Sequence, residues 1–220
     1  MMTHDGNNPK GGLSRAGSMD NGKGIADRLM EELHLSGKTI DDIVECLKQI
    51  PLHPRTAAAI RSAHALGCDL KVLSDANQFY IETILKHHGL YDCFSEIITN
   101  PTVMDKGRLR IFPYHDLTSM HGCNLCPPNL CKGIVIKHRK ALSLGDRKVQ
   151  YIYLGDGKGD FCPTLQLDER DYVMPRKEFA LCDLVLKKSS LVKAQVHEWS
   201  SGEELEKILL QLINDNSNKS

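Results

Sequence analysis

The sequence predicts an α/β protein with a Rossmann-like core built on a parallel β-sheet. Two apolar runs, residues 70–73 and 151–154, have the composition of buried strands, and each ends in a polar turn. Helix-like segments precede or follow these runs, and such alternation is typical of parallel sheets. The length of 220 residues fits one compact domain with a small satellite.

The amino-terminal quarter contains two different kinds of segment. Residues 1–24 are rich in Gly, Asn and Ser, a composition that buries too little apolar surface to order a chain, so we expect a disordered tail. Residues 25–54 have apolar positions spaced as on two short amphipathic helices. Thr39 starts the second of these helices, because Asp42 follows three residues later in a capping pattern.

Two further helices are predicted, one before the strand-like runs in the sequence and one after them. Residues 56–67 form a strong helical pattern that ends in glycine and leads directly into the strand-like run 70–73. Residues 202–213 form an amphipathic helix near the carboxyl end of the chain.

A first candidate site follows the strand at residues 70–73. Ser74, Asp75 and Asn77 come directly after it, and residues 78–85 resume a helical pattern. Small polar groups there can donate hydrogen bonds to phosphate oxygens, and the positive end of a helix favours an anion. The alternative interpretation is structural: Ser74 or Asp75 would cap the helix that follows.

A lysine and a pair of aspartates continue this pattern along the chain. Lys132 precedes the apolar segment 134–136, where it could neutralise phosphate charge or, alternatively, lie in solvent as a surface charge. Asp156 and Asp160 lie in the glycine-rich turn after residues 151–154. Two carboxylates at the carboxyl end of a strand suit Mg²⁺, although Asp160 could instead cap the next helix.

Taken together, these segments resemble the second, third and fourth motifs of the haloacid dehalogenase (HAD) phosphatases. More narrowly, the chain is similar to the phosphoethanolamine/phosphocholine phosphatase-like subgroup, which includes pyridoxal-phosphate and plant thiamine-phosphate-phosphatase-like proteins. The resemblance covers residues from about 29 to 212. The segments that carry it are residues 74–77, Lys132 and residues 155–163, with support from residues 99–101, 113–115, 123–132 and 174–177.

The resemblance implies an Mg²⁺-dependent hydrolysis of phosphoric monoesters of a small metabolite. It also implies a helical cap remnant at residues 25–54 and a HAD-like α/β core at residues 55–220. Within the matched motifs, Lys132 is the catalytic residue that the resemblance implies. Phosphate-binding residues would be Ser74, Asp75, Asn77 and Lys132, and the Mg²⁺ ligands would be Asp156 and Asp160, the latter directly or through water.

One motif of that family has no counterpart in this sequence. HAD phosphatases begin with a strand ending in Asp-x-Asp-x-Thr/Val, whose first Asp attacks phosphorus and whose second is general acid and base. No two aspartates here are separated by a single residue, and Asp5, Asp20 and Asp27 do not follow a buried strand. We therefore expect a truncated chain that lacks the amino-terminal core strand, with impaired or absent hydrolysis. The alternative is an inactive phosphatase that binds phosphate ligands or pairs with a full-length relative.

The cysteines suggest a separate feature. Cys123, Cys126 and Cys131 cluster in the sequence, and with nearby histidines they could bind zinc or form a redox-sensitive group. Half of the usual four-ligand pattern is missing, so a packed loop is the other interpretation. We expect the remaining five cysteines, Cys162 among them, in or near the core. A zinc-stabilised interaction module is accordingly a third functional hypothesis.

The overall composition excludes some partners. Lys plus Arg and Asp plus Glu each number 28, so the formal net charge is zero and no attraction to nucleic acid or a membrane surface is implied. No apolar run is long enough to span a bilayer, and the amino terminus lacks the apolar stretch of a secretory signal. We expect a cytoplasmic protein, with organellar targeting left open, whose exposed cap remnant favours self-association.

Overall fold

The computed structural model of the chain describes residues 24–116, 121–142 and 149–217. The helices are α1 (Ile25–Leu35), α2 (Ile40–Lys48), α3 (Pro54–Ala65), α4 (Gln78–His87), α5 (Lys132–Leu142), α6 (Phe161–Thr164), α7 (Ala180–Lys187) and α8 (Gly202–Ser217). The strands are β1 (Lys71–Asn77), β2 (Glu96–Asn100), β3 (Thr102–Asp105), β4 (Arg108–Ile111), β5 (Ile152–Gly155), β6 (Tyr172–Pro175) and β7 (Gln195–Val196).

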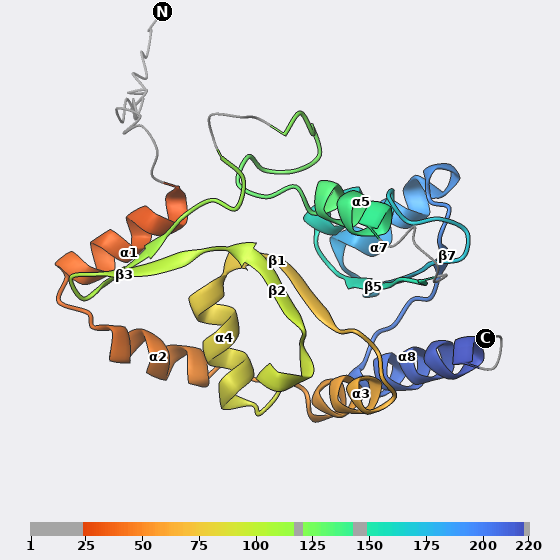
Figure 1. Cartoon of the computed structure of the whole chain (residues 1–220), viewed down its shortest axis with the longest axis horizontal. Helices are drawn as coiled ribbons and strands as arrows, with labels where there is room; N and C mark the ends of the chain where they lie inside the picture. The colour runs from red at the N-terminus through yellow and green to blue at the C-terminus, as the bar shows by residue number, and fades with distance from the viewer. Residues whose placement is uncertain (1–23, 117–120, 143–148, 218–220) are drawn as a thin grey trace, which may run out of the picture.

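The strands form three small sheets (Figure 1). β1 pairs with β2 in parallel, and β5, β6 and β7 form a three-stranded parallel sheet in that order. β3 and β4 form an antiparallel hairpin. The predicted α/β class with parallel strands joined through helices is therefore confirmed.

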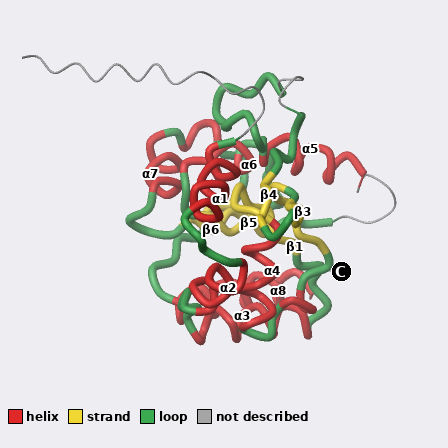
Figure 2. Tube along the Cα trace, turned by 90° about the vertical axis from the view of Figure 1, so that its left-hand side faces the viewer, coloured by secondary structure: helices red, strands yellow, loops and turns green. Residues whose placement is uncertain are grey.

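The three-stranded sheet lies between two layers of helices (Figure 2). Tyr172 and Met174 of β6 belong to a core cluster with residues of α3 and α8, whereas Val173 belongs to a cluster with residues of α5, α6 and α7. Successive side chains of a strand point to opposite faces, so this alternation follows from the strand geometry. All four residues of β6 are buried, as expected for a parallel strand covered on both sides.

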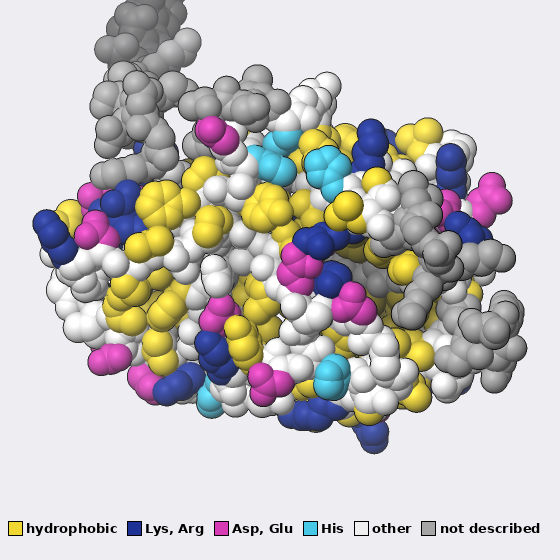
Figure 3. Space-filling view, viewed as in Figure 1, with side chains coloured by type: hydrophobic (Ala, Val, Ile, Leu, Met, Phe, Trp, Pro, Cys, Tyr) yellow, Lys and Arg dark blue, Asp and Glu magenta, His cyan; other side chains and the backbone are white. Residues whose placement is uncertain are grey.

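The amino-terminal helices pack on the hairpin and on α4. Met30 of α1 forms a core cluster with Leu109 and Ile111 of β4, and residues of α2 and α4 pack against it. Thr39 and Asp42 form the predicted capping box at the start of α2. Other apolar side chains of α1 are exposed, as expected for this segment, and Figure 3 shows hydrophobic side chains gathered over the region that α1, β3 and α2 occupy.

An ion cluster fixes α1 to the hairpin. Asp27 is 2% exposed, and its carboxylate accepts hydrogen bonds from Arg108 Nη2 at 3.0 Å, Arg110 Nε at 3.0 Å and the Ile111 backbone N–H at 2.9 Å. These contacts lower the pKa of Asp27 although burial alone would raise it. Asp27 therefore has a structural role, in agreement with its exclusion as a substitute nucleophile.

The hairpin itself is not evident in the sequence pattern. Its turn places Lys106 at φ 48° and Gly107 at φ 81°, a pair of positive angles typical of the tight turns that join antiparallel strands. Glycine adopts such angles readily. The first turn position is a lysine, which is not a typical turn residue, so the sequence pattern does not indicate the turn.

Most helices predicted from the sequence are present. α3 ends before Gly67, which adopts φ +83°, and α8 covers the predicted carboxyl-terminal helix. The expected disordered tail, residues 1–24, lies outside the described residues except for Gly24. Most of the chain before Leu29, where no core strand is expected, therefore lies outside them as well. Among the described helices, none is both long and apolar enough to cross a membrane.

Candidate functional site

A buried lysine connects the ends of two strands. The ammonium group of Lys132, the first residue of α5, lies 2.8 Å from Asp160 Oδ1 and 3.7 Å from Asp75 Oδ1. Asp75 belongs to the end of β1, and Asp160 follows β5 by five residues. Lys132 is 8% exposed and Asp160 6% exposed, so this ion pair is largely removed from solvent. The structure thus brings together three of the predicted site residues.

Asp160 is held by four donors. Its Oδ1 accepts hydrogen bonds from Lys132 Nζ and from the Tyr153 hydroxyl, both at 2.8 Å. Its Oδ2 accepts from the backbone N–H groups of Asp156 at 3.1 Å and Gly157 at 3.0 Å. Burial opposes the charged form, but the charge and hydrogen bonds of these groups, Lys132 above all, outweigh it and lower the pKa of Asp160. The Asp160 side chain does not cap α6, but its bond from the Gly157 N–H is part of a capping box on the short 3-10 helix Lys158–Asp160 that precedes α6.

The contact between Tyr153 and Asp160 also affects the pKa of the tyrosine. Burial, followed by the neighbouring carboxylate of Asp160, raises the pKa of Tyr153 well above its ordinary value. The hydroxyl therefore stays protonated and serves as a hydrogen-bond donor to Asp160.

Gly155 permits this arrangement. A Cβ at this position would lie 2.7 Å from Asp160 Cβ and 2.8 Å from Asp160 Cγ, closer than such atoms approach in proteins. The glycine in the turn is thus required by the Asp160 side chain that folds back over it. This packing accounts for the first glycine of the Gly-Asp-Gly-x-x-Asp pattern.

Asp156 differs from Asp160 in its surroundings. Its side chain is exposed, whereas its backbone N–H and carbonyl are fixed by Asp160 and by the Leu181 N–H. Both oxygens of Asp160 already have donors, so Asp156 is the residue suited to ligate a cation directly, and Asp160 is suited to act through water. Among the described residues, no group of three carboxylates or histidines lies close enough to hold a metal without further ligands. One or two carboxylates with waters and a substrate phosphate is nevertheless a usual environment for Mg²⁺.

Ser74 and Asn77 have roles in the loop that leads into α4. The Ser74 hydroxyl accepts a hydrogen bond from the Ala76 N–H at 3.2 Å. Asn77, which is 3% exposed, caps α4 by accepting from the Tyr80 N–H at 3.0 Å. The alternative that Ser74 or Asp75 caps this helix is therefore wrong, because Asn77 occupies the cap position. Phosphate binding by Ser74 and Asn77 stays a prediction.

Asn100 belongs to the site, although residues 99–101 only support the family resemblance in the sequence. Its amide group donates to the backbone carbonyls of Asp75 at 2.8 Å and Ala76 at 2.7 Å. Its side-chain oxygen accepts from the Tyr114 N–H at 3.1 Å and from Asn129 Nδ2 at 3.2 Å. Asn100 thereby ties the loop after β1 to the long loop that leads to Lys132. The signal for this role is the position of Asn100 at the end of β2, the strand that pairs with β1.

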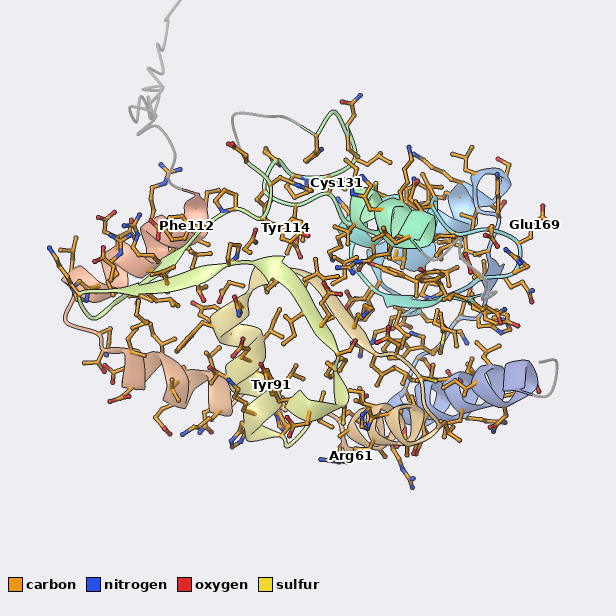
Figure 4. The ribbon with its side chains drawn as sticks, in the orientation of Figure 1. Arg61, Tyr91, Phe112, Tyr114, Cys131 and Glu169 are labelled. Carbon is orange, nitrogen blue, oxygen red and sulfur yellow. The ribbon has the colours of Figure 1, made fainter. Side chains whose placement is uncertain are left out.

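The cysteines of the long loop have a fourth partner. The sulfur atoms of Cys123, Cys126, Cys131 and Cys162 all lie within 4.8 Å of one another. Cys162 is buried, as expected, whereas the expectation of a core or near-core position is wrong for Cys46, which is exposed. The turn after Asp160 folds back and places Cys162 beside the loop cysteines. Cys131 directly precedes Lys132, and Figure 4 shows it where the long loop enters α5. Cys131 and Cys162 are close in the sequence to Lys132 and Asp160, respectively. The contact between Lys132 and Asp160 therefore also brings these two cysteines together.

Three of these thiols, those of Cys123, Cys126 and Cys162, have shifted pKa values. Burial raises the pKa of Cys126 to about 12 and that of Cys162 further still. The pKa of Cys123 is lowered in spite of burial, because the Leu125 N–H and neighbouring thiols donate hydrogen bonds to it.

The two parallel sheets do not join at the site. Among the described strands, β1 pairs only with β2, and β5 pairs only with β6. Leu73 of β1 and Tyr153 of β5 nevertheless pack against the same core cluster. Each of these strands therefore has one edge without a described partner strand, and their carboxyl ends converge on Lys132.

Comparisons with known proteins agree on one family. A family model described as "Putative Phosphatase" matches residues 20–213. The chain is 56% identical over 192 residues to the "Thiamine phosphate phosphatase-like protein" of Arabidopsis thaliana, covering 86% of this chain and 78% of that one. It is 52% identical over 194 residues to "Inorganic pyrophosphatase 2" of the same plant, covering 87% and 70%. It is 34% identical over 153 residues to the human "Pyridoxal phosphate phosphatase PHOSPHO2", covering 67% and 62%.

Proposed function

This chain belongs to the "Putative Phosphatase" family of HAD-type phosphatases, and on this basis we propose that its site binds the phosphate group of a small phosphorylated metabolite together with Mg²⁺. The relatives support the reaction class, since each is named for hydrolysis of a phosphorylated compound or pyrophosphate. Phosphatases of this superfamily are generally metal-dependent, and the choice of Mg²⁺ rests on the oxygen donors at the site.

The position of Lys132 is the observation that carries the proposal. Its ammonium group is fixed by Asp160 at 2.8 Å and approached by Asp75 at 3.7 Å, between the ends of two strands. An ammonium group has three donors, so at least one remains for a phosphate oxygen. A cation that is already held in position needs little rearrangement when an anion binds next to it. Such pre-positioned groups stabilise phosphate charge.

The metal ligands follow from the same geometry. Asp156 would hold Mg²⁺ directly and Asp160 through water, because only Asp160 already has donors on both oxygens. When bound, the ion screens the repulsion between anionic groups at the site. Asp160 has a second task in this arrangement, since it orients Lys132.

We further propose that the 220 residues hydrolyse phosphate esters slowly or not at all. The family reaction requires an aspartate nucleophile in an Asp-x-Asp pattern, and this sequence has no such pair. Asp27, the described aspartate nearest the amino terminus, is bound by two arginines and cannot serve.

A second candidate function is that of a binding module. The edges of β1 and β5 without a described partner strand favour it, because unpaired strand edges readily accept another extended segment. A full-length relative or a second copy of this chain could supply such a segment. This function predicts association without turnover.

Phosphate release by the purified chain is the first test. The panel should hold an aryl phosphate together with thiamine phosphate, pyrophosphate and pyridoxal phosphate, chosen from the names of the relatives. We expect no Mg²⁺-dependent turnover above that of an Asp156→Asn control. Turnover that this substitution abolishes would show that another carboxylate replaces the nucleophile and would contradict the proposed inactivity.

Ligand binding tests the proposed phosphate site independently of hydrolysis. Calorimetric titration with inorganic phosphate in the presence of Mg²⁺ should show binding that Lys132→Met abolishes. Lys137→Met is the matched control, since Lys137 lies on the same helix with an exposed side chain. Equal phosphate affinity in the wild type and in Lys132→Met would overturn the assignment.

A further inference from the structure

Four cysteine sulfur atoms form a compact group next to the phosphate site. Cys123 Sγ lies 3.6 Å and Cys131 Sγ 3.8 Å from Cys162 Sγ, and all four sulfurs, including that of Cys126, fall within 4.8 Å of one another. Zinc bound tetrahedrally by thiolates has Zn–S distances near 2.3 Å, which places the sulfurs about 3.8 Å apart. The two separations of 3.6 and 3.8 Å are close to this value.

We propose that Cys123, Cys126, Cys131 and Cys162 bind one structural Zn²⁺ ion. Four sulfur ligands in tetrahedral arrangement select zinc or iron–sulfur chemistry. A single ion fits better than an iron–sulfur cluster, because the iron and sulfide atoms of a cluster would hold the cysteine sulfurs further apart. A site closed by four protein ligands is a structural site, since no position remains for a substrate.

The loop that carries three of these cysteines has little apolar packing, although hydrogen bonds to Asn100 anchor it at two points. Residues 112–116 and 121–131, the described parts of the connection between β4 and α5, contain no helix or strand. Of residues 121–131, only Leu130 and Cys131 are buried. Loops of this length without regular structure are uncommon in compact domains unless they have a specific function. A metal ion would fix the loop where apolar packing does not.

Backbone groups around the sulfurs support thiolate ligands. The Leu125 N–H donates to Cys123 Sγ at 3.4 Å, within the Cys-x-x-Cys turn. Cys131 directly precedes α5, whose positive amino-terminal end stabilises a thiolate. Binding of Zn²⁺ to four thiols would release four protons to solvent and leave a net charge of −2 at the centre.

The approach of the two segments is built into the backbone. A Cβ on Gly133 would lie only 2.4 Å from Cys162 Sγ, so a glycine is required for α5 to come this close to the turn after Asp160. A surface hollow of about 130 Å³, lined by residues that include Cys123 and Cys126, provides a route for the ion. The site thus has four ligands, suitable distances and an entry path.

The location of the ion gives it a positioning role. Cys131 is adjacent to Lys132 in the chain, and Cys162 is two residues after Asp160. Zinc would therefore hold together the two segments that carry the 2.8 Å ion pair of the phosphate site. The existence of the zinc site does not depend on the proposed phosphate binding.

The metal content of the chain purified under reducing conditions tests this proposal. We expect one zinc ion per chain by elemental analysis, and a zinc absorption-edge spectrum with four sulfur neighbours at about 2.3 Å. Cys162→Ser should lose the bound zinc, whereas Cys182→Ser should keep it. Cys182 is the matched control because it is 5% exposed, against 6% for Cys162, and lies outside the cluster.

Alkylation of the wild-type chain covers the case in which Cys162→Ser does not fold. Added Zn²⁺ should protect the four cluster thiols from a maleimide reagent, as read by mass spectrometry, while the exposed Cys46 reacts in either case. A chain that binds no zinc on incubation with Zn²⁺ and shows equal alkylation with and without it would overturn the proposal. So would a disulfide between any two cluster cysteines under reducing conditions. Neither assay uses Mg²⁺ or phosphate, so a failure here is distinct from a failure of the phosphate site.

Discussion

The Asn100 side-chain amide donates to the backbone carbonyl of Asp75 at 2.8 Å and so fixes the turn at the end of β1 from the neighbouring strand. The same amide donates to Ala76, and its oxygen accepts from the loop that leads to Lys132. Asn100 is 5% exposed, and its hydrogen bonds to these partners are partly buried. The position of Asp75 relative to Lys132 therefore depends on a residue that is not an expected ligand or catalyst.

Substitution of Asn100 should weaken both stability and the site. Asn100→Asp cannot donate to two carbonyls, so we expect the free energy of unfolding to fall by about 2 to 4 kcal/mol in urea denaturation. Asn129→Ala removes only one bond to Asn100 and should cost about 1 kcal/mol. Similar losses for the two variants would show that Asn100 does not hold the turn.

Gly133 should be intolerant of a side chain. Gly133→Ala places Cβ 2.4 Å from Cys162 Sγ, so α5 or the turn has to move, and we expect a loss of about 1 to 3 kcal/mol. Gly159→Ala is the comparison, since a Cβ there meets no atom within 4 Å, and its effect should stay within about 0.5 kcal/mol. Thermal unfolding of the two variants side by side measures the difference.

The Asp27 ion cluster should give the stability a pH dependence. The folded-state pKa of Asp27 lies below its ordinary value, so its contribution is present above about pH 4 and is lost as the pH falls through the folded pKa. Asp27→Asn should lower the free energy of unfolding by about 2 to 4 kcal/mol at neutral pH and flatten its decline in acid.

Asp105→Asn is the control for the Asp27 substitution. Asp105 lies 3.7 Å from Arg110 with a side chain that is 53% exposed, so its ion pair is screened and should contribute about 0.5 kcal/mol or less. Urea denaturation from pH 3 to 7 compares the variants. Parallel pH profiles for Asp27→Asn and the wild type would contradict the assigned role.

Tyr153→Phe should test the hydrogen bond to Asp160. The substitution removes one of four donors on the Asp160 carboxylate without changing the ring, and we expect a loss of about 1 kcal/mol. Because the lost donor favours the charged form, the pKa of Asp160 should rise toward its ordinary value. Carboxyl carbon chemical shifts followed by pH titration measure this change. An unaltered Asp160 titration would show that the hydroxyl does not contribute.

Sequence patterns predicted the features that depend on local chemistry. The capping box at Thr39 and the glycine stop at Gly67 need only neighbouring residues, and both are present. The order of the motifs singled out Lys132 and Asp160, whose contact spans 28 residues, while their roles in binding stay predictions. The capping box and the glycine stop share one cause, since each relies on spacing that the backbone fixes.

Other features depend on long-range packing that spacing does not encode. The sequence offered Ser74 and Asp75 as caps of α4, yet Asn77 takes that position because the extended backbone of β1 continues through it. Cys162 could not be joined to the loop cysteines, which are 31 residues or more away, without knowing that α5 meets the turn after Asp160. The two donors that reach Asn100 likewise lie 14 and 29 residues away from it, in the long loop that leads to Lys132.

The packing of α8 on α3 affects how the chain can fold during synthesis. One face of β6 is covered by Ala59 and Ala63 from α3 and by Leu205 and Leu209 from α8, segments that lie more than a hundred residues apart. A nascent chain cannot complete this layer until α8 has left the ribosome, because contacts of large sequence separation form only when both partners are available. Until then the apolar face of β6 is accessible to other chains. Chaperone binding would therefore be most important in the interval between the synthesis of β6 and the emergence of α8.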